Sequence, residues 1–267
     1  PQASPARPVT ASPWPADVSG GDLFEIRRRK LEEFERSGGE AFPRGFDVDA
    51  PLGPVAARFD DHDAEQLEAD AERLRLAGRI VNSRGHGKTS FADISDGSGS
   101  IQIYMRRDDL GEDVYEAWQK LDLADYVGVE GVLMRTRSGE LTLKVDRYTL
   151  LAKSLRPLPE KWHGLKDTEI RYRQRYLDLA ASDEVREVFR RRAAALRALR
   201  AHLDAHGFIE VETPIMQPQY GGALARPFTT RHIALGIGLY LRIAPEVYLK
   251  RLLVGGLERV YELNRNF

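Results

Sequence analysis

The sequence predicts an α+β protein in which a small five-stranded barrel precedes the first part of an antiparallel-sheet domain. Three observations lead to this prediction. Five stretches rich in β-branched and aromatic residues lie between residues 75 and 151, separated by turn signals. After Ser182, apolar residues recur at three- and four-residue spacing, as in an amphipathic helix. Short alternating stretches then follow as far as Phe267.

Composition places the chain among soluble globular proteins. Its 267 residues are 42% hydrophobic and 30% charged. The net charge is only −1, so any nucleic-acid partner must bind a local basic or aromatic patch. The chain has no cysteine, which excludes disulfides within it and suits the reducing cytoplasm. No apolar run approaches the roughly 20 residues of a membrane span, so we expect no membrane partner.

The N-terminal part predicts a tail and a helical extension. Residues 1–21 hold five prolines with alanine, serine and glycine, a composition typical of a disordered tail. In the extension, residues 22–74, apolar spacing predicts a helix from Asp22 to Ser37 and a second from Asp61 to Leu74. Prolines at 43, 51 and 54 predict a loop over residues 40–60.

The first predicted helix carries a basic face with Arg27, Arg28, Arg29, Lys30 and Arg36. This face has two interpretations. It contacts an RNA backbone, or it is a solvated surface whose charge is balanced by Glu32, Glu33 and Glu35, and we favour the second.

Residues 75–151 predict a nucleic-acid-binding barrel. Strands are expected at 76–82, 90–94, 101–105, 126–135 and 141–150, with a helix at 113–120. Five strands with a helix after the third is the order of the OB-fold, which commonly binds oligonucleotides. A generic five-stranded barrel is the alternative.

Within this barrel, three side chains are candidates for RNA contacts. Phe91 is a stacking platform for a base, or alternatively a core residue. Gln102 is placed to reach a base edge, and Arg79 to hold a phosphate or a base. Lys88 and His86, in a glycine-rich turn, are more typical of general phosphate contacts.

Residues 152–181 predict a connector, because Pro157 and Pro159 interrupt regular structure. The stretch Lys161-Trp162-His163-Gly164 and the run Arg171 to Tyr176 are basic and aromatic. They either contact tRNA phosphates or pack between domains and at a dimer boundary, and we favour packing.

In the last part, residues 182–267, the residue pattern predicts helices alternating with strands. Ser182 caps a helix that Gly207 ends. Alternating residues predict strands at 208–214, 239–243 and 258–267, and Pro245 starts a helix that runs through Val254. From the residues alone, Arg242, Lys250 and Arg251 are interpreted as surface or interface charges.

Several stretches resemble a known family. They are Gly-Phe-Ile-Glu-Val-Glu-Thr-Pro (207–214), Leu-Tyr-Leu-Arg-Ile-Ala-Pro-Glu (239–246) and Glu-Arg-Val-Tyr-Glu-Leu-Asn-Arg-Asn-Phe (258–267). Together with residues 153–167 and 171–179, they resemble class II aminoacyl-tRNA synthetases, and most of all the lysyl-tRNA synthetases. The resemblance covers roughly residues 22–267 and implies the N-terminal part of such an enzyme, ending within its second signature motif.

The resemblance implies two sets of binding residues. Arg79, Phe91, Gln102 and Glu140 fall where the family reads the lysine anticodon. Gly222 and Glu246 match residues that bind the lysine substrate. From the residues alone, Glu246 has a simpler role as a carboxylate that complements the dipole at a helix start.

The resemblance also implies a reaction and its partners. Family members activate lysine with ATP and Mg²⁺ to lysyl-adenylate, transfer it to tRNA(Lys), and form homodimers in the cytoplasm, with Glu210 and Glu212 near the dimer contact. No catalytic residue is identifiable, because the family's ATP-binding arginine and glutamate follow the position of Phe267. We therefore expect this chain alone not to form the adenylate. The alternative is a non-catalytic RNA-binding module with a truncated synthetase-like platform.

Overall fold

The computed structural model describes residues 21–40, 42–159 and 165–267. The chain divides into two compact units, residues 1–181 and residues 182–267. The expected disordered tail and the stretch Lys161-Trp162-His163-Gly164 lie outside the described residues, apart from Gly21.

Within the described residues, three helices precede the barrel: α1 (Gly21–Arg36), α2 (Leu52–Arg58) and α3 (Ala64–Asp70). The prediction of a loop over residues 40–60 was wrong, because α2 lies inside it. Its prolines are compatible with a helix, since Pro51 is the N-cap and Pro54 lies in the first turn, where no backbone N–H is needed. Burial of Leu52 and Val55 against the barrel core stabilises this short helix.

The second predicted helix is shorter than expected. Asp63 accepts a hydrogen bond from the Gln66 backbone in a capping box, and Ala71 ends α3 with a positive φ of 41°. Residues 73 and 74, expected to be helical, instead begin the first strand, where Leu74 is buried and pairs with Gly131.

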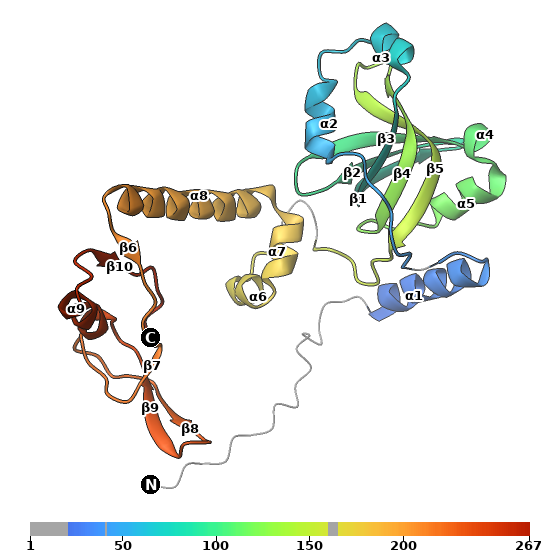
Figure 1. The fold of residues 1–267 in the computed structure, drawn as a ribbon. Helices are drawn as coiled ribbons and strands as arrows, with labels where there is room; N and C mark the ends of the chain where they lie inside the picture. The colour runs from blue at the N-terminus through green and yellow to red at the C-terminus, as the bar shows by residue number, and fades with distance from the viewer. Residues whose placement is uncertain (1–20, 41, 160–164) are drawn as a thin grey trace. The chain divides into compact units, whose positions relative to one another are not determined.

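The barrel consists of β1 (Arg73–His86), β2 (Thr89–Ser95), β3 (Ser100–Arg106), β4 (Tyr126–Arg135) and β5 (Leu141–Ala152) (Figure 1). The strands form a closed barrel in the order β1-β2-β3-β5-β4, and the pairing of β3 with β5 is parallel. Helices α4 (Arg107–Leu110) and α5 (Glu112–Gln119) follow β3. Five strands with helices after the third confirm the predicted OB-fold.

Alternation along each strand produces the barrel core. In β2, for example, Ser90, Ala92 and Ile94 point inward while the residues between them are only half-buried. Ile103, Leu143 and Val145 are fully buried in the same cluster. Each such aliphatic side chain contributes roughly 1.5 to 3 kcal/mol by leaving water, so this core carries most of the stability of the first unit.

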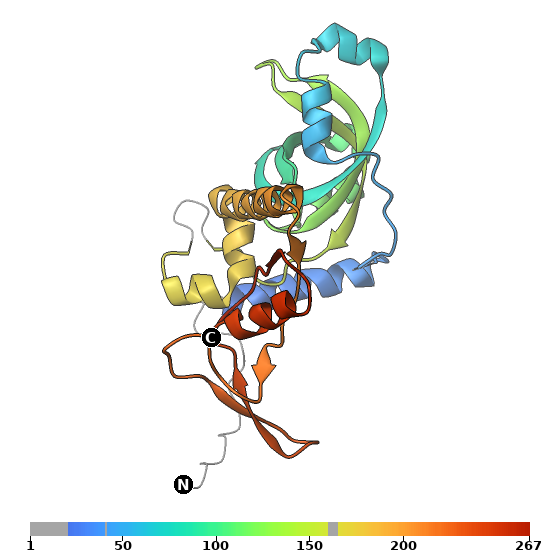
Figure 2. The same ribbon diagram turned by 60° about the vertical axis from the view of Figure 1, so that its left-hand side comes forward.

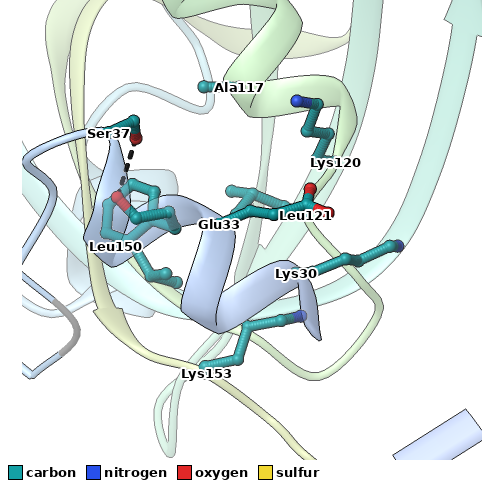
Figure 3. A pocket seen from close by; sticks show the side chains of 9 residues that line it. Lys30, Glu33, Ser37, Ala117, Lys120, Leu121, Leu150 and Lys153 are labelled. Carbon is teal, nitrogen blue, oxygen red and sulfur yellow. Dashed lines mark hydrogen bonds between the residues drawn. The ribbon is translucent and has the colours of Figure 1, made fainter. Parts of the chain in front are cut away.

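Helix α1 is held against the barrel by charged groups around a small cavity of about 90 Å³ (Figure 3). The Lys30 ammonium lies 2.7 Å from Asp122, and Lys153 lies 2.5 Å from Asp122 and 2.8 Å from the buried Asp125. Burial alone would raise the pKa of Asp122, but hydrogen bonds from Lys153 and Lys30 outweigh it and lower that pKa. The outer face of α1 carries its own counter-charges, since Arg28 pairs with Glu25 and Glu32.

The expected connector contains two short helices, α6 (Thr168–Arg173) and α7 (Arg175–Ala181). Asp178 is buried and binds Arg171 at 3.2 Å and also Arg175. These two arginines of the basic run are therefore neutralised within the chain.

The second unit begins with the long helix α8 (Asp183–Ala205), capped by the Ser182 hydroxyl as predicted and continuous in both ribbon views (Figures 1 and 2). Gly207 follows it with φ +75°. Two small sheets come next: β6 (Ile209–Glu210) with β10 (Val260–Tyr261), and β7 (Met216–Gln217) with β9 (Ile237–Leu241) and β8 (Thr229–His232). Helix α9 (Glu246–Val254) lies between β9 and β10.

Two strands of this unit are shorter than predicted. The alternating residues 208–214 and 258–267 form ladder pairs only at Ile209 with Val260 and at Glu210 with Tyr261. A strand extends only as far as its backbone is paired with a neighbour, and among the described residues this ladder has two pairs.

Candidate nucleic-acid interface and amino-acid site

The outward face of the barrel carries two rows of side chains, defined by the strand register. We call Arg84, Phe91, Tyr104 and Lys144 the aromatic row, because consecutive members are paired residues of β1, β2, β3 and β5. We call Asn82, Asp93, Gln102 and Thr142 the polar row, which lies two residues along each strand. Residues two apart on a strand share a face, so the two rows lie side by side on one face of the sheet, where Gln102 and Thr142 are buried.

Phe91 lies on this surface and outside the core cluster. Its ring centroid is 4.8 Å from that of Tyr104, with an interplanar angle of 40°. The aromatic pair is flanked by two cationic side chains at the ends of its row. Rings between cations suit a stacked base with phosphates on either side. The structure therefore favours the surface interpretation of Phe91 over the core interpretation.

Gln102 and Glu140 are in direct contact. The Gln102 Nε2 donates to Glu140 Oε2 at 2.9 Å, and the Thr142 hydroxyl donates to Gln102 Oε1 at 2.8 Å. Next to them, the Asn82 amide donates to Asp93 at 2.9 Å. Gln102, Glu140 and Asp93 line a recess of about 400 Å³, which has room for a nucleobase edge.

Arg79 lies apart from this group. Its guanidinium stacks over the Tyr126 ring at 4.5 Å and its Nη1 is 3.5 Å from the Ala124 carbonyl. On β1 it is five residues from Arg84, the partner of Phe91, which corresponds to about 16 Å along the strand. The structure thus brings together three of the four predicted anticodon residues.

Gly222 and Glu246 are neighbours in the second unit. Gly222 has φ +89°, and a Cβ at that position would lie 3.2 Å from the Ala244 Cβ and 3.4 Å from the Glu246 Cβ. Both the backbone conformation and this close approach favour glycine. Glu246 opens α9, and its half-exposed carboxylate binds the Lys250 ammonium at 2.5 Å. Lys250 and Glu246 thus form an exposed ion pair one helical turn apart, and the Glu246 carboxylate lies next to Gly222.

The interpretation of Arg242 as a surface charge was wrong. Arg242 and Glu262 are each 4% exposed, and their charged atoms lie 2.5 Å apart. Arg242 also donates to the Thr213 hydroxyl at 3.0 Å, and its Nε donates to the Arg265 carbonyl at 3.1 Å. The pair tolerates burial because further hydrogen bonds reach the Arg242 Nε and Nη1 and both Glu262 oxygens.

Glu262 is the acceptor of this buried network. It accepts from the Thr213 hydroxyl at 2.8 Å and from the Thr213 backbone N–H at 3.2 Å. Burial alone would raise the pKa of Glu262, but these hydrogen bonds and Arg242 lower it below its usual value. The network joins the segments at 213, 242 and 262–267, which are the stretches that carried the family resemblance.

Other predicted charges have partners within the chain. Lys250 and Arg251 are exposed, as interpreted, and Arg251 lies 4.9 Å from the Tyr248 ring. Glu210 binds Arg200 at 3.0 Å and is 3.3 Å from the Tyr261 hydroxyl. Its carboxylate therefore has contacts that do not depend on a second subunit.

Neither a metal-binding cluster nor a membrane-spanning helix occurs within residues 21–40, 42–159 and 165–267. No group of three or more metal-binding side chains comes together in that part of the chain. None of the helices described there has the length and apolar character needed to cross a bilayer.

Two parts of the chain match the models of known families. Residues 74–151 match the OB-fold nucleic acid binding domain, and residues 167–267 match the class II tRNA synthetases (D, K and N). The chain is therefore an OB-fold domain joined to a class II tRNA synthetase segment, which confirms the resemblance seen in the sequence.

Curated lysine–tRNA ligases are similar to the chain over most of its length. The chain is 52% identical to the lysine–tRNA ligase of Moorella thermoacetica over 92% of its own length and 49% of the relative. It is 50% identical to the lysine–tRNA ligase of Syntrophomonas wolfei and 48% identical to that of Cupriavidus pinatubonensis, covering 50% and 51% of those proteins. The chain is thus similar to lysine–tRNA ligases along most of its length, and it spans about half the length of the curated relatives that it matches.

Proposed function

We propose that this chain acts in the ligation of lysine to its tRNA. In this proposal the barrel binds the lysine anticodon, and the second unit supplies part of the lysine site. The observation that carries the proposal is the identity of about 50% to lysine–tRNA ligases, which extends over both units. A module that had kept only RNA binding would not be expected to retain such similarity in its synthetase segment.

The aromatic and polar rows supply the anticodon contacts. One anticodon base stacks on Phe91, and Gln102 and Glu140 face its hydrogen-bonding edge. Arg79, on its own part of the face, contacts a neighbouring phosphate or base. Single-stranded RNA is commonly read by this combination of stacking and edge contacts.

Gly222 and Glu246 supply the amino-acid contacts. The ammonium group of the bound lysine replaces Lys250 at the Glu246 carboxylate, and the Gly222 backbone approaches the substrate because no side chain is in the way. ATP is the second substrate of the proposed activation. Mg²⁺ would supply charge neutralisation at the phosphates, but the described residues offer no cluster that fits it, so we assign no step to it.

A homodimer and a cytoplasmic location complete the proposal. No residue of α8 is buried, and Val188 and Leu199 on that helix are 63% and 42% exposed. An isologous contact around α8 and the segment ending at Pro214 would cover such residues in both subunits. Light scattering is the direct measurement, and a monomeric full-length protein would exclude this part of the proposal.

Two measurements test the two halves of the function. The 267-residue chain is titrated with anticodon stem-loops that differ at one anticodon base, with binding of the lysine anticodon expected to be tightest. The chain is also joined in frame to the C-terminal half of the Moorella thermoacetica relative and assayed for lysine-dependent ATP–pyrophosphate exchange. Base-selective binding without exchange, in a chimaera shown to be folded, would favour the RNA-binding module instead.

A further inference from the structure

The Gln102 side chain has a fixed orientation on the outward face of the barrel. A carboxylate only accepts hydrogen bonds, so the nitrogen of the Gln102 amide must face Glu140 and the oxygen must face Thr142. Glu140 takes up one of the two N–H groups of the amide, and Thr142 takes up one of the two lone pairs of its oxygen. The amide therefore keeps one N–H donor and one oxygen lone pair for a ligand.

Thr142 takes part in this arrangement without reaching the surface. Its side chain is fully buried, with 0% exposure, whereas Gln102 is 6% exposed and borders the recess. The Thr142 hydroxyl lies 3.2 Å from the Glu140 carbonyl in addition to its 2.8 Å bond to Gln102. Any effect of this hydroxyl on a ligand must therefore pass through Gln102.

We propose that Thr142 is a positioning residue for base selection. It holds the Gln102 amide so that one donor and one acceptor face a nucleobase that offers a complementary acceptor and donor. The inference rests on the proposed function, because it concerns the same anticodon site. Gln102 and Thr142 are paired in the parallel register of β3 and β5, which places the Thr142 hydroxyl within hydrogen-bonding distance of the Gln102 amide.

The test compares base discrimination among matched variants of the 267-residue chain. Thr142→Val removes the hydroxyl while keeping the side-chain shape, and Thr142→Ser restores it. Thr149→Val makes the same change elsewhere on β5, opposite Gly128. The readout is the ratio of dissociation constants between the lysine anticodon stem-loop and stem-loops with one base changed, by fluorescence anisotropy.

We expect Gln102→Ala to abolish discrimination at one anticodon position. Thr142→Val should reduce the ratio at that same position about fivefold, the usual worth of one neutral hydrogen bond. Thr142→Ser and Thr149→Val should keep the original ratio. A loss of affinity by Thr142→Val that is equal for all stem-loops would show a purely structural role and overturn the inference.

A second variant covers the case in which Thr142→Val fails to fold. Glu140 is exposed, so Glu140→Gln should fold normally, but a glutamine there no longer forces one orientation on Gln102. Its discrimination should fall at the same position, and unchanged discrimination would contradict the inference. If Gln102→Ala loses selectivity while Thr142→Val keeps it, only this inference fails. If the unchanged chain binds no stem-loop, the proposed anticodon function fails with it.

Discussion

The barrel and the second unit are stabilised in different ways. The buried apolar cluster includes residues of α2, α3, α5 and all five barrel strands. Among the described residues of the second unit, only Ile243 and Tyr261 are buried hydrophobic residues. That unit contains instead the buried pair Arg242–Glu262. Apolar burial is non-directional, whereas a buried ion pair depends on both partners and on their protonation. The second unit should therefore be the more sensitive to single polar changes.

The largest expected effect is that of Arg242→Met. It leaves Glu262 buried without its cation, which typically costs about 3 to 5 kcal/mol. Hydrogen exchange read by mass spectrometry should show faster exchange across residues 182–267 and no change in the barrel strands. The double variant Arg242→Met with Glu262→Met is the control, because replacing both charges with apolar groups removes the unpaired carboxylate. Equal destabilisation of both units would contradict the comparison.

Protonation of Glu262 at low pH should also destabilise the second unit more than the barrel. The pKa of Glu262 is lower in the folded state than its ordinary value of 4.5. The ionised carboxylate therefore contributes fully to stability above pH 4.5, and this contribution is lost as the pH falls through the pKa of the folded state. Expressed as protection factors, which remove the intrinsic pH dependence of amide exchange, protection of residues 182–267 should be steady from pH 7 to that value and fall below it. Glu262→Gln should remove this dependence. A profile that is unchanged in Glu262→Gln would assign the acid sensitivity to another group.

In the barrel, Phe91→Ala should weaken RNA binding without lowering stability. Phe91 lies outside the core, so the melting temperature should change little, while binding of the anticodon stem-loop should weaken by roughly 1 to 3 kcal/mol, the worth of one stacked base. Leu143→Ala, a core change, provides the opposite pattern of lower stability. Unchanged affinity in Phe91→Ala would exclude Phe91 from the RNA contact.

The smallest expected effect is at α1. Lys30→Met removes one partially exposed ion pair with Asp122, for which about 0.5 to 1 kcal/mol is typical. Exchange in α1 should become faster, and the difference from the unchanged chain should shrink at high salt. Arg28→Met, at an exposed pair on the outer side of the same helix, should leave α1 unchanged. Equal effects of the two variants would mean that the contact with Asp122 does not hold the helix.

The sequence predicted those features that depend on neighbouring residues. The five barrel strands follow from period-two alternation and glycine-rich turns, and the Ser182 cap from local hydrogen bonding. Helix α2 was missed because its prolines were read as helix breakers, although their positions at the helix start are compatible with a helix.

The missed features depend on pairing between distant segments. Arg242 meets Glu262 and Thr213 only through the fold, and its sequence neighbours indicate a surface strand. Tyr104 and Thr142 join the candidate site through strand register. Tyr104 stands two residues after Gln102, so the strand period was the one signal that pointed to it.

The parallel pairing of β3 with β5 has a kinetic consequence. It joins Gln102 to Thr142 across 40 residues, whereas β1, β2 and β3 are joined by short hairpins. Pairings between residues far apart in sequence form late in folding, because the intervening loop must lose its entropy first. The polar row is thus complete only after barrel closure. Under the proposed function, a nascent or partly folded chain would display Phe91 and Tyr104 while Gln102 lacked its Thr142 partner, so it would contact RNA without selecting one base.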